Sequence, residues 1–208
     1  MRKMTRLSLV AGAAVAVVGG AMTAVPSSAA PGGGECALSG TANFHPGPGV
    51  NPSGAFAYDF GGKLTNCGDS TSGPGGFGKI TGTISAGQPI TIGGVTYQEP
   101  TATGTGSCAT GDTAGTAIVQ WSDNTATVIK YTTKSVAAGV VLQGNAIPSI
   151  VLTSADGTQT TTVTTSKYSG AGAAGVLAFE VADPTQCNTP GGVTSAGIDG
   201  VTGLGSQS

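Results

Sequence analysis

The chain has a single histidine, His45, and any Ser-His-Asp hydrolase site would have to use it as the general base. It stands in "NFHPGPGV", at the end of a predicted strand and before a Pro-Gly turn. The G-x-S-x-G motif that presents the serine nucleophile of α/β-hydrolases does not occur in the chain. We therefore expect His45 to be structural or solvent-exposed, and we predict no catalytic triad.

A glycosidase would need two carboxylates that face each other across a cleft. Glu35 lies near the N-terminus of the exported chain, and Glu99 precedes a proline in a predicted loop. Of the seven aspartates, Asp59 alone lies within a predicted strand, whereas the others stand beside turn residues, where their side chains cap the backbone. Glu180 alternates with apolar residues in "LAFEVAD" and is expected to face outward, as is Asp59. Asp59 and Glu180 would form an acid pair only if the strand faces that carry them lined the lumen of a barrel.

All four cysteines, Cys36, Cys67, Cys108 and Cys187, are spaced too widely for a CxxC metal or redox motif. An even number of cysteines in an exported chain predicts disulfides, here two of them. Three pairings are possible. Cys36 begins the first predicted strand and Cys67 ends the second, so antiparallel pairing of these strands favours Cys36–Cys67 and leaves Cys108–Cys187. With the cysteines oxidised and one histidine, we predict no metal site and no cofactor.

Aromatic side chains are the remaining candidates for binding. Phe56, Tyr58 and Phe60 alternate along one predicted strand and share a face, and Trp121 is the only tryptophan. Such a triplet is more often core than a ligand platform. The alternative is that these four residues line a barrel lumen and bind a small apolar ligand.

The N-terminus predicts export. Arg2, Lys3 and Arg6 precede an apolar segment rich in Gly and Ala, and the small-residue sequence "PSSAAP" follows. This is the layout of a secretory signal peptide, which we assign to residues 1–29. No later apolar run reaches the roughly 18 residues that a membrane helix needs. We therefore expect a protein that is secreted and extracellular or associated with the cell wall.

Without that segment, five lysines stand against ten acidic residues and no arginine remains, for a formal charge of −5. Such a chain has no basic patch to bind nucleic acid or an anionic membrane. Glycine and proline make up about a quarter of it, which raises the question of disorder. The low charge, the alternating strand patterns and the four cysteines favour a folded domain with Gly-rich turns.

Short alternating runs separated by turn residues predict an all-β fold, and no segment shows a sustained helical period. We expect a single antiparallel domain over residues 30–187 with about nine or ten short strands. It would form an up-and-down barrel or a two-sheet sandwich, and the many short links favour the barrel. Residues 188–208 would add a closing strand or form a tail.

The segment 115–131, "GTAIVQWSDNTATVIKY", predicts a β-hairpin. A two-residue turn at Asp123–Asn124 would make the numbers of paired residues sum to 247, because Asp and Asn tolerate the positive φ of such turns. Trp121 would then pair with Ala126, and Tyr131 would lie on the opposite face. We favour Trp121 as a plug at the end of the core; the alternative places it at the rim of a barrel mouth.

The segments "CALSGTANFHPG", "GAFAYDFGGKLTNC", "GTGSC" and "GTAIVQWSDNTAT" resemble an uncharacterised group of exported, Gly/Thr-rich proteins of high-GC Gram-positive bacteria. The resemblance spans about residues 36–187 and implies export and a disulfide-linked β domain, with no activity to carry over. The composition is also similar to the shorter chromophore-carrying proteins of the neocarzinostatin type, although their cysteines pair across short loops.

Three functional hypotheses follow. The first is a secreted, non-enzymatic β domain that binds a cell-surface component or has a structural role. The second is a carrier that holds a small apolar ligand in a barrel lumen. The third is a secreted hydrolase that uses the acid pair Asp59 and Glu180. The sequence favours a protein that is not an enzyme.

Overall fold

A computed structural model describes residues 34–51, 53–69, 80–136, 139–181 and 183–205. The predicted signal peptide lies outside the described residues. The described chain is almost entirely β-structure, as predicted, with one short 3₁₀ helix, η2 (Pro184–Asn188). It has thirteen strands: β1 (Gly34–His45), β2 (Ala55–Asp69), β3 (Ile80–Ala86), β4 (Pro89–Ile92), β5 (Val95–Gln98), β6 (Ala102–Gly106), β7 (Gly111–Trp121), β8 (Ala126–Val136), β9 (Gly139–Ile147), β10 (Ser149–Ser154), β11 (Thr160–Thr164), β12 (Gly172–Val181) and β13 (Ser195–Gly205).

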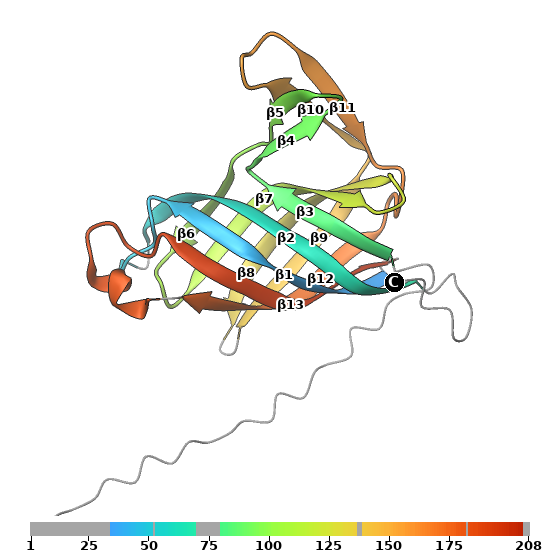
Figure 1. The fold of residues 1–208 in the computed structure, drawn as a ribbon. Coiled ribbons are helices and arrows are strands. Elements are labelled where there is room, and N and C mark those ends of the chain that lie inside the picture. The colour runs from blue at the N-terminus through green and yellow to red at the C-terminus, as the bar shows by residue number, and fades with distance from the viewer. Residues whose placement is uncertain (1–33, 52, 70–79, 137–138, 182, 206–208) are drawn as a thin grey trace, which may run out of the picture.

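Eight of these strands form a closed, antiparallel, up-and-down barrel (Figure 1). Their order around the wall is β1-β2-β3-β7-β8-β9-β12-β13, and β1 pairs with both β2 and β13. Each strand pairs with the next barrel strand along the chain, so the fold is the barrel rather than the sandwich. Residues 195–205 form β13, which pairs with both β1 and β12 and thereby closes the ring. A closed barrel leaves no strand edge unpaired.

A second, four-stranded sheet in the order β11-β10-β5-β4 stands beside the barrel (Figure 1). The chain leaves the wall after β3, forms the β4–β5 hairpin, and returns to the wall as β6. Like β3, β6 lies between β2 and β7 and pairs with both. β10 and β11 come from the segment between β9 and β12. This small sheet packs on the outside of β7, where Ile118 is buried with Ile90, Tyr97 and Leu152. These short strands account for most of the difference from the expected nine or ten.

The β7–β8 hairpin pairs in a register one residue away from the prediction. Partner numbers sum to 246, so Ala117 pairs with Ile129 and Gly115 with Tyr131. The cause is a three-residue loop, in which Asn124 has φ 63° and the Trp121 N–H donates to the Thr125 carbonyl. A shift of one residue moves one strand's side chains to the other face, so Trp121 and Tyr131 lie on the same, inner face. The expectation that they face opposite sides was wrong.

Glycines in the barrel wall lie beneath the aromatic rings of the interior. A Cβ built on Gly104 would lie 2.4 Å from Cζ of Phe56, and one on Gly115 would lie 2.7 Å from the hydroxyl oxygen of Tyr131. The pairs Gly62 with Phe60 and Gly82 with Trp121 are also close, at 2.7 and 3.1 Å. An eight-stranded barrel has an interior just wide enough for side chains to fill, so large rings need positions without side chains opposite them. Many of the glycines therefore lie in strands of the barrel wall, and not only in turns.

Both predicted disulfides are confirmed. Cys36–Cys67 joins the start of β1 to the end of β2, and Cys108–Cys187 joins the β6–β7 turn to η2. They therefore staple the two opposite ends of the barrel.

Candidate ligand-binding site at the barrel mouth

The two ends of the barrel differ. At one end lie the β6–β7 turn, the C-terminal ends of β1, β8 and β12 and the N-terminal ends of β2, β9 and β13; we call this end the mouth. At the opposite end, Trp121 closes the interior: it is 5 % exposed, its indole Nε1 donates to Thr127 Oγ1 at 2.9 Å, and its ring packs edge-on against Tyr168. The end-plug interpretation of Trp121 thus agrees with its position, and Trp121 takes no part in the mouth.

A cavity of about 340 Å³ occupies the mouth. This volume is within the range of about 300–1,000 Å³ that small-molecule sites usually have. The described residues that line it include no charged side chain. Its apolar lining consists mainly of Phe44, Pro48, Phe56, Val136, Val140, Ala178, Phe179, Val181, Val193 and Ala196, and its hydroxyl groups come from Ser107, Thr110, Thr113, Thr133 and Ser135.

Three aromatic rings form a cluster below the mouth. Phe44 and Phe56 pack edge to face with centroids 5.5 Å apart, and Tyr58 lies 6.1 and 6.3 Å from them. Phe179, by contrast, faces inward on β12, like the neighbouring Leu177, yet 37 % of it is exposed. An accessible aromatic ring that points into an uncharged cavity is the strongest sign of a ligand site in the described chain.

The barrel interior below the mouth is nearly full. The cavity there has a volume of only about 60 Å³, and it shares Phe44, Thr113, Thr133 and Phe179 with the mouth cavity. Since a water molecule takes about 30 Å³ of the liquid, this space could accept a small group but not a whole ligand. The barrel fold is compatible with the carrier hypothesis, and the larger space for a ligand lies at the mouth rather than deep in the lumen.

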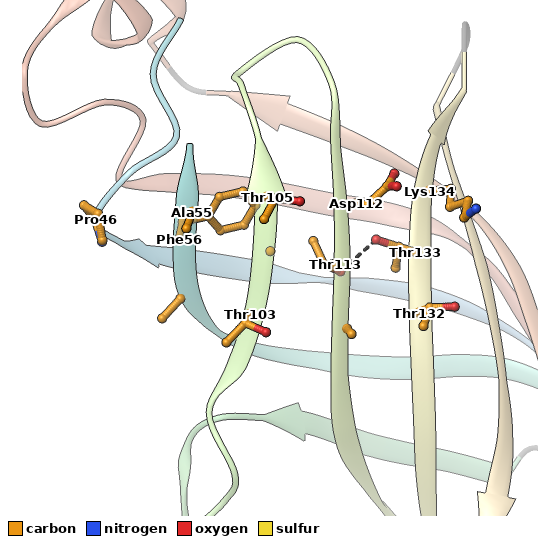
Figure 2. Close-up of a pocket in the computed structure, with 13 residues that line it drawn as sticks. Pro46, Ala55, Phe56, Thr103, Thr105, Asp112, Thr113, Thr132, Thr133 and Lys134 are labelled. Carbon is orange, nitrogen blue, oxygen red and sulfur yellow. Dashed lines mark hydrogen bonds between the residues drawn. The ribbon is translucent and has the colours of Figure 1, made fainter. Parts of the chain in front are cut away.

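A chain of hydroxyl groups, buried except for the half-buried Thr113, runs through the interior to the mouth. The Tyr131 and Tyr58 hydroxyls lie 2.6 Å apart, Tyr58 donates to Thr113 Oγ1 at 3.0 Å, and Thr113 Oγ1 lies 2.7 Å from Thr133 Oγ1. Figure 2 shows the last of these hydrogen bonds. Burial raises the pKa of both phenols, that of Tyr131 well above its ordinary value, so each keeps its proton and can donate it.

A larger hollow, about 720 Å³, lies on the outer face of β2, β6, β7 and β8 (Figure 2). Thr103, Thr105, Asp112, Thr132 and Lys134 line it and are all exposed. Small-molecule sites usually enclose most of the ligand surface, which such an open face does not. We therefore place the candidate site at the mouth.

The four aromatic residues that the sequence indicated lie at different places in the barrel, with Trp121 at the end opposite the mouth. Phe56 lines the mouth, and Tyr58 and Phe60 line the small inner cavity. All three are buried, as a core role requires. Phe44, Phe179, Thr113 and Thr133 were missing from the candidates. Strand alternation puts Phe44 and Phe179 on inner faces, but only the tertiary structure shows which inner residues reach an open end.

Asp59 and Glu180 do not form the acid pair of the hydrolase hypothesis. Both lie on the outer face of the barrel, since Asp59 stands between the buried Tyr58 and Phe60, and Glu180 is exposed. Glu180 pairs with Gly197, Gly197 with Thr41, and Thr41 with Gly61, so β12 and β2 are three strand-to-strand steps apart. At about 4.8 Å a step this separation exceeds the roughly 5–9.5 Å between glycosidase carboxylates.

Asp59 instead belongs to a polar cluster with His45. Its Oδ1 accepts from Asn43 Nδ2 at 2.8 Å and from Gln88 Nε2 at 3.0 Å, and its Oδ2 lies 3.2 Å from His45 Nε2. Partial burial raises the pKa of Asp59, but these hydrogen bonds and the histidine together outweigh it and hold the pKa below its ordinary value. His45 is mostly exposed and takes part in this surface cluster.

Glu99 is buried, which its place before a proline did not indicate. It is 1 % exposed, and its carboxylate accepts from Ser85 Oγ at 2.6 Å and from the Gln88 N–H at 3.1 Å. Burial raises its pKa in spite of these two hydrogen bonds. Ser85 is the β3 partner of Ile118, so Glu99 lies where the small sheet leaves the barrel wall rather than in the mouth.

In the described ranges, no three His, Cys, Asp or Glu side chains gather as metal ligands would. No helix among the residues described has the length and apolarity to cross a membrane. Comparison with protein-family models, curated proteins and solved structures found no match.

Proposed function

We propose that the protein is an exported, non-enzymatic binding protein that takes up a small, uncharged, mainly apolar molecule at the mouth of its barrel. The observation that supports this most directly is Phe179, which faces an uncharged cavity of about 340 Å³ and keeps 37 % of its surface accessible. An apolar molecule seated there would cover the ring and remove apolar surface from water.

Export is supported by the signal-like N-terminus and by the two disulfides, since such bonds persist in oxidising compartments. Uncharged ligands are favoured because the described lining has no group to pair with a charge, and burial of an unpaired charge is costly. The ligand would occupy the mouth, with at most a small group in the inner cavity.

A matched pair of dyes tests this function. N-phenyl-1-naphthylamine is uncharged and fluoresces strongly in apolar sites, and 8-anilinonaphthalene-1-sulfonate has the same ring skeleton with an added sulfonate. We expect the uncharged dye to bind the oxidised protein with saturation, and the sulfonate to bind more weakly. No saturable binding of the uncharged dye would contradict the proposal.

A pair of variants locates the binding. Phe179→Ser should weaken binding of the uncharged dye about tenfold, because the loss of roughly 1.4 kcal/mol of apolar contact corresponds to that factor. Val176→Ser is the matched control, since Val176 is an exposed residue of the same strand on the outer face. An equal effect of both substitutions would place the dye elsewhere.

A further inference from the structure

The hydroxyl chain below the mouth has more protons than it uses. Its members are Tyr131, Tyr58, Thr113 and Thr133, and three hydrogen bonds join them. Each hydroxyl has one proton to donate, so four protons serve three bonds. The described chain offers no further hydrogen bond to these four side-chain oxygens, so one proton has no acceptor there.

The direction of the bonds locates that proton. Tyr58 donates its only proton to Thr113, so the bond between the two phenols must be donated by Tyr131. Only one of Thr113 and Thr133 can donate in the bond between them. The proton without an acceptor therefore belongs to one of these two threonines.

Both threonines line the mouth cavity as well as the inner cavity. Thr133 is buried, only 6 % exposed, so water can satisfy its hydroxyl only by entering the site. The other hydroxyls of the mouth differ from this pair. Ser135 Oγ donates to the Gly111 carbonyl and accepts from the Gly111 N–H, whereas Ser107, whose Oγ accepts from the Ala109 N–H, and the exposed Thr110 lie in the β6–β7 turn at the rim.

We infer that the mouth offers one hydrogen-bond donor at its base, on Thr113 or Thr133, and that its ligand is an uncharged apolar molecule with an acceptor oxygen such as a ketone or ester carbonyl. This inference rests on the proposed function and narrows the ligand class. The acceptor would sit near the Thr113–Thr133 hydrogen bond of Figure 2, and the apolar part would contact Phe44, Phe56 and Phe179. A pure hydrocarbon would leave the donor unpaired.

Fluorene and fluorenone test the inference, because they share one ring frame and differ in a CH₂ or C=O group. Their dissociation constants are measured by competition against N-phenyl-1-naphthylamine. Since the two differ in hydrophobicity, the quantity to compare is the fluorene-to-fluorenone ratio of dissociation constants in different variants. Thr113→Val/Thr133→Val keeps the shape of both side chains and removes both hydroxyls, and the remaining Tyr58 hydroxyl lines only the inner cavity.

We expect this ratio to fall about three- to tenfold in the valine variant, which is the factor for one neutral hydrogen bond. Thr113→Ser/Thr133→Ser keeps both hydroxyls and should retain the wild-type ratio, which separates the loss of a donor from a general disturbance of the mouth. An unchanged ratio in the valine variant, or an equal fall in the serine variant, would overturn the inference and leave the proposed function standing. Absence of dye binding would overturn both.

Discussion

Single glycines determine how the interior aromatic rings pack. Gly104 of β6 faces inward beneath Phe56, and a Cβ there would lie 2.4 Å from the ring and 3.0 Å from Cγ2 of Thr113. The ring could not keep its place on the wall beside a methyl group. Because Phe56 also lines the mouth, the packing of this one position affects both stability and the shape of the site.

Gly104→Ala should therefore lower the free energy of unfolding by about 1–3 kcal/mol, the usual cost of an overpacked core. Gly197→Ala is the matched control: it is also a strand glycine, but its Cβ would meet no atom closer than 3.6 Å. The control should change stability by no more than about 0.5 kcal/mol. Urea denaturation of the oxidised variants measures both, and equal effects would contradict the role given to Gly104.

The buried carboxyl of Glu99 makes stability depend on pH. Burial raises the pKa of Glu99 in the folded protein, so the folded state binds this proton more tightly than the unfolded state. The contribution of Glu99 to the free energy of unfolding is then fully present below its unfolded pKa of about 4.3, and it is lost as the pH rises through the folded pKa.

Glu99→Gln removes this titration. The free energy of unfolding of the variant minus that of wild type should therefore be larger at pH 7 than at pH 3.5. Its amide can still accept from the Gln88 N–H or pair with Ser85, the two partners of the carboxylate. Denaturation at both pH values measures the difference, with Glu180→Gln on the exposed outer face as the control. A difference between Glu99→Gln and wild type that is the same at both pH values would contradict the prediction.

Among the structural elements, the two disulfides have different consequences for the site. Cys108 lines the mouth cavity and is bonded to Cys187 of η2, whereas Cys36–Cys67 joins β1 and β2 at the opposite end. The sequence separations are 79 and 31 residues, and a cross-link over a longer loop restricts the unfolded chain more.

Cys108→Ser/Cys187→Ser should lower stability by about 2–5 kcal/mol and also weaken binding of N-phenyl-1-naphthylamine. Cys36→Ser/Cys67→Ser should lower stability but leave the dissociation constant of the dye unchanged, because that end does not touch the mouth. Binding is measured at a temperature where circular dichroism shows both variants folded. If the two pairs affected binding equally, the site would not be at the mouth.

The whole molecule consists of two parts that we expect to differ in stability. The barrel has a continuous core and no free strand edge, whereas the small sheet has a separate core of Ile90, Tyr97, Ile118 and Leu152 and ends in the edge strands β11 and β4. Units with few buried apolar contacts open locally at a lower free energy than the global transition.

Amides of β10 should consequently exchange with deuterium faster than those of β8, which is paired on both sides within the barrel. Hydrogen exchange followed by mass spectrometry measures this. Binding of N-phenyl-1-naphthylamine should add protection at the β6–β7 turn and leave β10 unchanged. Equal protection of β10 and β8 without ligand would show that the molecule opens as one unit.

Several features follow from the sequence by itself, because they depend on local patterns. Alternation with a period of two put Leu38, Ala42 and Phe44 on one inner face and Phe56, Tyr58 and Phe60 on another, where the structure buries all six. The antiparallel order of the first two strands paired Cys36 with Cys67, and the last pair followed by elimination. Short links between successive strands favoured the meandering barrel, which the strand order confirms.

Other features were decided only by the tertiary structure. The hairpin register depends on a three-residue loop that contains Asn124. The sequence Asp-Asn is compatible with both a two-residue and a three-residue loop, so it did not determine the register. Ile118 and Glu99 are buried because two segments far apart in the chain meet as one small sheet outside the barrel. The mouth arises because Trp121 closes the opposite end while Phe179 stays accessible. Strand alternation defines the inner side of a wall, but only the closed ring of long-range pairings determines which inner residues meet at an opening.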